Sequence, residues 1–305
     1  MRRVIGLFAA TAVVGTGLLV GSAGAVTSAA KPLGVKQITL DLVDSSRPTP
    51  ANGTYPGAPN RELKTVVSIP TRGGKPLRGP LPLIVFATGY GGTATNYAPL
   101  YDHWVRAGYV VAAPTFPLSS DNAPGGTSPI DLDSQPGDVS FVLDQVLEQS
   151  ASGKKPLKGL VDADRVGLAG KSLGAITSLD VGYVPQLQDK RFKAVVAMTG
   201  VAGSAADFTT IHTPLLLVHG DADTDLPISG SQQTYARAGS PKFFVTLFGQ
   251  THGSAFGGGS KPAEKVVERT TLDFLDLYVR GEKSALRRLE KDGNTKSVSS
   301  LQASP

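Results

Sequence analysis

Short apolar segments alternate with amphipathic segments along most of the chain. Residues 81–88 (LPLIVFAT) form a continuous apolar run, which is typical of a strand buried on both faces. Residues 139–149 instead carry apolar side chains every three or four positions, which predicts a helix with one buried face. The same patterns predict strands at 35–43, 63–69, 81–88, 109–113, 165–169, 192–198, 214–218 and 242–248, and helices at 95–107, 139–149, 173–179, 229–238 and 263–279, with a short helix after 281. This alternation predicts an α/β domain over residues 35–292, with a mostly parallel sheet covered by helices on both faces.

The first 25 residues follow the order of a secretory signal peptide. Arg2 and Arg3 precede seventeen residues without a charge (4–20), and small residues follow up to Ala25. An uncleaved membrane anchor is the alternative, but a helix of this length spans only about 26 Å, slightly less than the hydrocarbon core of a bilayer. No basic cluster that would stop transfer follows it. We therefore expect residues 1–25 to be removed near Ala25. The mature protein would be secreted, extracellular or associated with the cell wall, without stable membrane insertion.

Composition narrows the classes of chemistry that the chain can perform. The sequence contains no cysteine, which excludes disulfides, thiolate zinc sites, iron–sulfur clusters and a cysteine nucleophile. The net charge of +5 is modest, and no basic stripe interleaved with aromatic residues is present, so nucleic acid is not an expected partner. We expect a monomer. Residues 26–34 are predicted to be a linker, and residues 293–305 (GNTKSVSSLQASP) a polar, disordered tail.

A candidate nucleophile lies between a predicted strand and a predicted helix. The segment Gly170-Lys171-Ser172-Leu173-Gly174 matches G-x-S-x-G, in which a sharp strand-to-helix turn needs glycine on both sides of the serine. Such a turn lifts the serine oxygen above the edge of the sheet. A tight turn with an inert surface serine is the alternative, but the position between a buried strand and a helix favours Ser172 as nucleophile.

A serine nucleophile needs a base, and the chain has four histidines. His252 follows the last predicted strand, and reacting groups in open α/β sheets gather at the carboxyl ends of strands. His103 falls inside a predicted helix, and His212 precedes a strand at the opposite end of the sheet. His219 ends a predicted strand, where a structural role is more common. Position therefore favours His252.

Three aspartates can supply the carboxylate that orients the base. Asp221, Asp223 and Asp225 all lie in residues 219–227 (HGDADTDLP), and any of them could instead be a turn or helix-cap aspartate. Together with Ser172 and His252 they complete the chain order serine, aspartate, histidine.

From about Leu63 to Leu289 the chain resembles an α/β-hydrolase, with the nucleophile turn, the acid loop and the histidine loop in the order of that family. In such enzymes the acid commonly stands in a stretch reading H-G-x-x-D with a proline four residues later. Asp223 with Pro227 fits this pattern, and Asp221 and Asp225 remain alternatives. The resemblance implies a catalytic triad of Ser172, Asp223 and His252 that needs no metal and no cofactor.

The resemblance also implies an oxyanion hole made by two backbone N–H groups, those of Tyr90 and Leu173. Tyr90 lies in the glycine-rich turn 89–92 (GYGG) after the strand at 81–88. This turn could instead cradle a phosphate, but it matches neither G-x-x-x-x-G-K-[ST] nor G-x-G-x-x-G. The residues expected to line the substrate site are Gly89, Gly91, Lys171 and Thr199.

Only 41 residues separate Ser172 from Pro214, which leaves no room for a large cap domain. An open site of this kind favours bulky or extended substrates. Residues 161–166 (VDADRV) and 274–278 (FLDLY) resemble the secreted group that includes cutinase-like polyester hydrolases, chlorophyllases and dienelactone hydrolases. We therefore expect a secreted serine carboxylesterase, with bulky or polymeric esters among its candidate substrates. The alternatives are a serine peptidase on the same fold and an inactive binding protein on a hydrolase scaffold.

Overall fold

The computed structural model describes residues 33–153, 156–259 and 261–305. The predicted signal peptide, residues 1–25, lies outside the described residues, as does the predicted linker up to residue 32. Across the described ranges, no helix combines the length and the apolar character that crossing a membrane requires.

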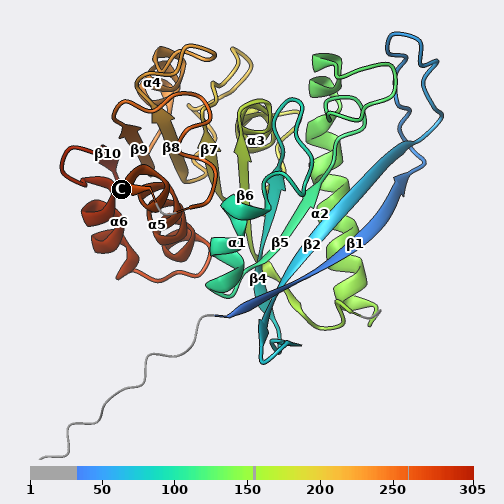
Figure 1. The fold of residues 1–305 in the computed structure, drawn as a ribbon, viewed down its shortest axis with the longest axis horizontal. Coiled ribbons are helices and arrows are strands. Elements are labelled where there is room, and N and C mark those ends of the chain that lie inside the picture. Colours follow the sequence, from blue (N-terminus) through green and yellow to red (C-terminus); the bar gives the residue numbers. More distant parts are fainter. Residues whose placement is uncertain (1–32, 154–155, 260) are drawn as a thin grey trace, which may run out of the picture. The chain divides into compact units, whose positions relative to one another are not determined.

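The described chain folds around one mixed sheet of ten strands (Figure 1). The strands are β1 (Gly34–Asp44), β2 (Arg61–Arg72), β3 (Lys75–Pro76), β4 (Leu81–Ala87), β5 (Val110–Pro114), β6 (Val161–Lys171), β7 (Phe192–Met198), β8 (Leu215–Gly220), β9 (Lys242–Leu247) and β10 (Ser299–Ser304). Their order across the sheet is β1-β2-β5-β4-β6-β7-β8-β9-β10, and β3 pairs with β2. Every pairing from β5 across to β9 is parallel, whereas the pairings of β1, β2, β3 and β10 are antiparallel. The prediction of an α/β domain is confirmed.

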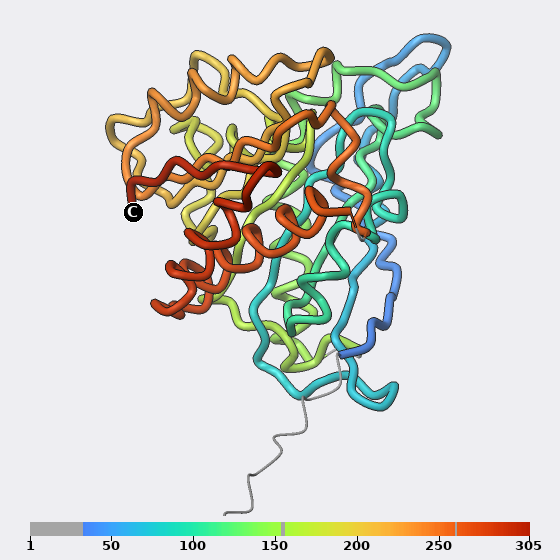
Figure 2. The backbone as a smooth tube through the Cα atoms, turned by 60° about the vertical axis from the view of Figure 1, so that its left-hand side comes forward, coloured from blue at the N-terminus to red at the C-terminus, as the bar shows by residue number. Residues whose placement is uncertain are grey.

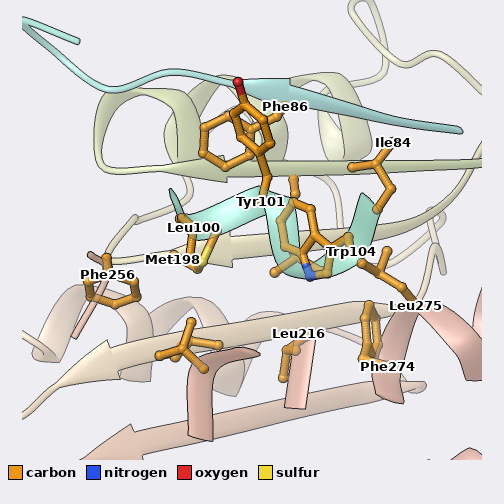
Figure 3. Close-up of a cluster of buried hydrophobic side chains, with 14 of the residues drawn as sticks. Ile84, Phe86, Leu100, Tyr101, Trp104, Met198, Leu216, Phe256, Phe274 and Leu275 are labelled. Atoms are coloured by element: carbon orange, nitrogen blue, oxygen red, sulfur yellow. The ribbon is translucent and has the colours of Figure 1, made fainter. Parts of the chain in front are cut away.

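Helices cover both faces of the sheet. They are α1 (Ala98–Arg106), α2 (Gln135–Ala151), α3 (Leu173–Tyr183), α4 (Ser229–Arg237), α5 (Pro262–Tyr278) and α6 (Ala285–Gly293), with a 3₁₀ helix at Pro129–Asp133. Alternate residues of β4 point to opposite sides, because successive side chains of a strand leave opposite faces of the sheet. Ile84 and Phe86 pack with Trp104 of α1 and Leu275 of α5 (Figure 3), whereas Leu83 and Val85 belong to the core that α2 covers. The continuous apolar run at 81–88 therefore reflects burial on both faces.

The C-terminal residues are ordered, so the prediction of a disordered tail at 293–305 was wrong. Helix α6 ends at Gly293, and β10 then pairs antiparallel with β9. This C-terminal segment is the dark red part of the tube in Figure 2. Leu301 packs against the core, and the buried Ser299 donates a hydrogen bond to the Gly293 carbonyl at 2.9 Å. Backbone pairing with an existing strand holds this polar segment, and hydropathy gives no signal for such pairing.

A buried charge cluster fixes the loop that follows β5. Arg61 of β2 contacts Asp138 through Nε at 2.7 Å and Asp131 through Nη2 at 2.8 Å, and all three side chains are fully buried. The second oxygen of Asp131 accepts from the backbone N–H groups of Leu118 and Ser119. The Ser119 carbonyl in turn accepts from the Gly91 N–H at 2.7 Å. The cluster thus supports the turn that carries Tyr90.

Replacing Arg61 with methionine should lower the free energy of unfolding by about 3–5 kcal/mol, because the buried Asp131 would lose its cation and the buried Asp138 would lose one of its two. Chemical denaturation measures this loss. Arg165, whose side chain is 38% exposed and which contacts the partly exposed Asp162 at 2.6 Å, is the control. Arg165→Met should cost no more than about 1 kcal/mol. Equal losses for the two variants would contradict the role assigned to Arg61.

Candidate active site

Ser172 lies at a strained turn between β6 and α3. Its φ of +57° is unusual for a residue with a side chain, and its N–H donates to the Met198 carbonyl at 2.9 Å. A Cβ on Gly170 would lie 2.1 Å from the Gly174 carbonyl oxygen, and one on Gly174 would lie 2.1 Å from that of Ala87. Both glycines are therefore required by the close approach of β4, β6 and α3. The turn is built as the G-x-S-x-G pattern predicts.

Three loops bring the predicted catalytic side chains together. Ser172 follows β6, Asp223 follows β8 and His252 follows β9, all at the carboxyl ends of parallel strands. His252 Nε2 lies 2.8 Å from Ser172 Oγ, and His252 Nδ1 lies 2.7 Å from Asp223 Oδ2. An Nδ1–H that donates to the carboxylate leaves Nε2 free to accept from the serine hydroxyl. His252 is therefore placed to accept the proton of the Ser172 hydroxyl.

Of the three candidate aspartates, the structure places Asp223 against His252. Its side chain is fully buried, and its Oδ1 accepts from the backbone N–H groups of Asp225 and Leu226 at 3.0 Å each. Burial alone would raise the pKa of Asp223, but the Leu226 N–H and the His252 ring outweigh burial and hold that pKa below its ordinary value. Asp221 instead accepts from the Gly249 N–H at 2.6 Å, and the Asp225 side chain is exposed. Asp223 is therefore held as an anion beside the imidazole.

His219 also contacts the buried carboxylate of Asp223, and the sequence analysis did not predict this contact. Its Nε2 lies 3.0 Å from Asp223 Oδ2 and 2.9 Å from the Leu226 carbonyl, and its Nδ1 lies 2.7 Å from Ser231 Oγ. Burial lowers the pKa of His219, although the Leu226 carbonyl and Asp223 act against this shift. The H-G-x-x-D stretch itself was the available signal, because it places a histidine four residues before the acid. His219 ties the acid loop to the end of β8 and to α4.

The two predicted oxyanion donors, Tyr90 and Leu173, belong to segments that meet at Ser172. Leu173 is the first residue of α3, so its N–H has no acceptor within the helix. In the turn after β4, the Gly91 N–H donates to the Ser119 carbonyl and the Gly92 N–H to the Gly89 carbonyl, whereas that of Tyr90 donates to no acceptor among the described residues. A Cβ on Gly89 would lie 3.3 Å from Ser172 Cβ, so this turn approaches the serine closely. Two N–H groups without an acceptor among the described residues thus lie in the two segments that meet at Ser172, the start of α3 and the turn after β4.

A cavity of about 380 Å³ opens at Ser172. Its walls consist of Tyr90, Tyr97, Lys171, Ser172, Leu173, Ile176, Asp225, Leu226 and His252. Lys171 was predicted to line the site and does so. Tyr97, Ile176, Asp225 and Leu226 were not predicted to line it, because their places in the wall depend on how the helices and the acid loop pack.

Three residues predicted to line the substrate site do not line this cavity. Thr199 is fully buried because its N–H extends the ladder to β8, donating to the Val218 carbonyl at 2.8 Å. Gly89 is buried against Tyr97 and the Lys171 carbonyl, and Gly91 turns away to pair with Ser119. These glycines shape the turn, and from this turn Tyr90 contributes to the cavity wall. Tyr90 is 51% exposed, and its hydroxyl donates to the Thr127 carbonyl at 2.9 Å.

Within the residues that the structure describes, no group of three or more histidine, aspartate or glutamate side chains is placed to hold a metal ion. No model of a known protein family matches the sequence, and no curated protein matches it significantly.

Proposed function

We propose that this protein is a serine carboxylesterase of the α/β-hydrolase fold, in which Ser172, His252 and Asp223 act as nucleophile, base and orienting acid. The observation that carries this proposal is the continuous contact from Ser172 Oγ through His252 to Asp223, at 2.8 and 2.7 Å, on a serine with a φ of +57°. The order of these residues along the chain and their places after β6, β8 and β9 support the proposed fold. The signal-like N-terminus supports export, so the proposed enzyme acts outside the cell.

The proposed reaction proceeds through an acyl-enzyme. Ser172 Oγ attacks the ester carbonyl while His252 Nε2 takes the hydroxyl proton, and the carbonyl oxygen becomes an oxyanion that the N–H groups of Tyr90 and Leu173 receive. Collapse of this intermediate breaks the C–O bond, and the alcohol leaves with the proton from His252. Water then attacks the acyl group in the same way, which releases the acid and regenerates Ser172. Asp223 stabilises the imidazolium that forms in each half-reaction.

Partitioning of a shared intermediate tests this proposal. Two esters with the same acyl group but different alcohols are hydrolysed by the full chain in water containing methanol, and the ratio of methyl ester to free acid is measured. If both esters form one acyl-enzyme, the ratio is identical for the two. A ratio that depends on the departing alcohol would contradict the covalent intermediate. No hydrolysis of either ester by the folded protein would contradict the esterase assignment itself.

A further inference from the structure

Lys171 directly precedes Ser172 in the chain and is the one lysine among the residues that line the cavity. It is the last residue of β6, and the residue is only 8% exposed. Most of its neighbours in the wall are apolar or aromatic, namely Tyr90, Tyr97, Leu173, Ile176 and Leu226. An ammonium group is unfavourable in such a wall, because it loses part of its hydration there. An apolar side chain would fill the same space without that cost.

The ammonium of Lys171 has no partner in the described ranges. No carboxylate there lies within 4.0 Å of its nitrogen and no hydrogen bond from it is formed, but the nitrogen is not among the fully buried polar atoms without a partner, so it keeps some contact with solvent. The two acids that influence it are Asp223, whose oxygens already accept from two ring nitrogens and two backbone N–H groups, and the exposed Asp225. Lys242 shows the contrast, because its partly buried ammonium donates to the carbonyls of Tyr235 and Ala238 at 2.9 and 2.8 Å.

Partly burying an unpaired cation is unfavourable unless an anion compensates for the water that it loses. Burial lowers the pKa of Lys171, while the charges of Asp223 and Asp225 act in the opposite direction. A carboxylate entering the cavity would both pair with the ammonium and replace the solvation that the fold removes. The compensating anion can therefore come from the substrate.

We infer that Lys171 forms a carboxylate-binding subsite beside Ser172, and that the preferred substrates are esters carrying a free carboxylate, such as half-esters of dicarboxylic acids. This inference rests on the proposed esterase function. The aromatic and aliphatic wall accommodates the chain between the ester and the carboxylate. Asp225, at the exposed side of the cavity, opposes a second negative charge there, so removal of its charge strengthens the preference.

A matched pair of esters tests the subsite. 4-Nitrophenyl hydrogen adipate and 4-nitrophenyl hexanoate have the same acyl length and differ only in a terminal carboxylate or methyl group. In Lys171→Met, the ratio of kcat/KM for the adipate ester to that for the hexanoate ester should fall about 10- to 100-fold relative to the unmodified protein. In Asp225→Asn the same ratio should rise. High salt should reduce the preference of the unmodified protein.

Lys193→Met is the matched control, because Lys193 is an exposed lysine at the amino end of the neighbouring strand β7. Lys193→Met changes the net charge by the same amount, but at the amino ends of the strands, away from the cavity. The ratio of kcat/KM for the adipate ester to that for the hexanoate ester should therefore stay unchanged. If Lys171→Met does not fold, Lys171→Gln takes its place. An unchanged ratio in the Lys171 variant, or an equal loss for both esters, would overturn the subsite while leaving the esterase assignment intact.

Binding without turnover separates the two proposals. In a Ser172→Ala background, calorimetry should detect monomethyl adipate more readily than methyl hexanoate, and Lys171→Met should abolish the difference. If the unmodified protein hydrolyses neither aryl ester but this binding difference is present, the proposed function fails and the subsite stands. If the two methyl esters bind equally, the subsite is refuted.

Discussion

Replacing Ser172 with alanine is expected to lower kcat for ester hydrolysis by about 10⁴-fold or more. The acyl group would be transferred to the hydroxyl oxygen of Ser172. Among the described contacts, His252 Nε2 has no other hydroxyl partner that could replace it. Alanine keeps the Cβ that the turn already accommodates at a φ of +57°, so the fold should be retained. Initial rates with 4-nitrophenyl hexanoate measure the loss, and circular dichroism with thermal unfolding checks the fold. Ordinary turnover by folded Ser172→Ala would refute Ser172 as the nucleophile.

Asp223→Asn is expected to lower kcat by about 10⁴-fold, with little change in KM. An amide in place of the carboxylate can donate to His252 Nδ1, which leaves the proton on Nε2, where it cannot accept from Ser172. The amide also loses the negative charge that stabilises the imidazolium. Steady-state kinetics across a range of pH measure the effect.

Asp221→Asn provides the control for the acid loop. Asp221 is two residues from Asp223 and exposed, and its side-chain oxygen accepts from the Gly249 N–H, which an asparagine oxygen can also do. This variant should keep kcat within about threefold of the unmodified protein, as expected for a surface substitution. If Asp221→Asn and Asp223→Asn lose activity equally, the choice of Asp223 as orienting acid is wrong.

The sequence pattern was informative wherever one local rule decides the structure. Strand β7 begins and ends at the predicted residues, Phe192 and Met198, because every residue in it except Lys193 is apolar and the polar residues Arg191 and Thr199 flank it. The site at Ser172 was predictable for a related reason, since G-x-S-x-G at a strand-to-helix boundary allows few backbone conformations. The carboxyl ends of parallel strands then limited where a base and an acid could lie.

Features that depend on contacts distant in sequence were not predictable. Strand β10 is polar and exists because β9 offers an edge for pairing, which no local pattern reveals. His219 contacts Asp223 only because the loop after β8 folds back onto the strand end. Thr199 follows a strand in the sequence but continues the ladder into the buried sheet, so its position after a strand did not place it in the cavity.

The most direct test of the central claim is the intact mass of the mature chain after reaction with a serine-directed fluorophosphonate, with the modified residue located by peptide sequencing. An activated serine displaces fluoride and forms one phosphonyl adduct, whereas ordinary surface serines do not react. The arrangement of Ser172, His252 and Asp223 predicts a single adduct, on Ser172, that is absent from Ser172→Ala and strongly reduced in Asp223→Asn. A folded protein that stays unmodified, or one modified at another serine, would contradict the assignment of Ser172 as an activated nucleophile.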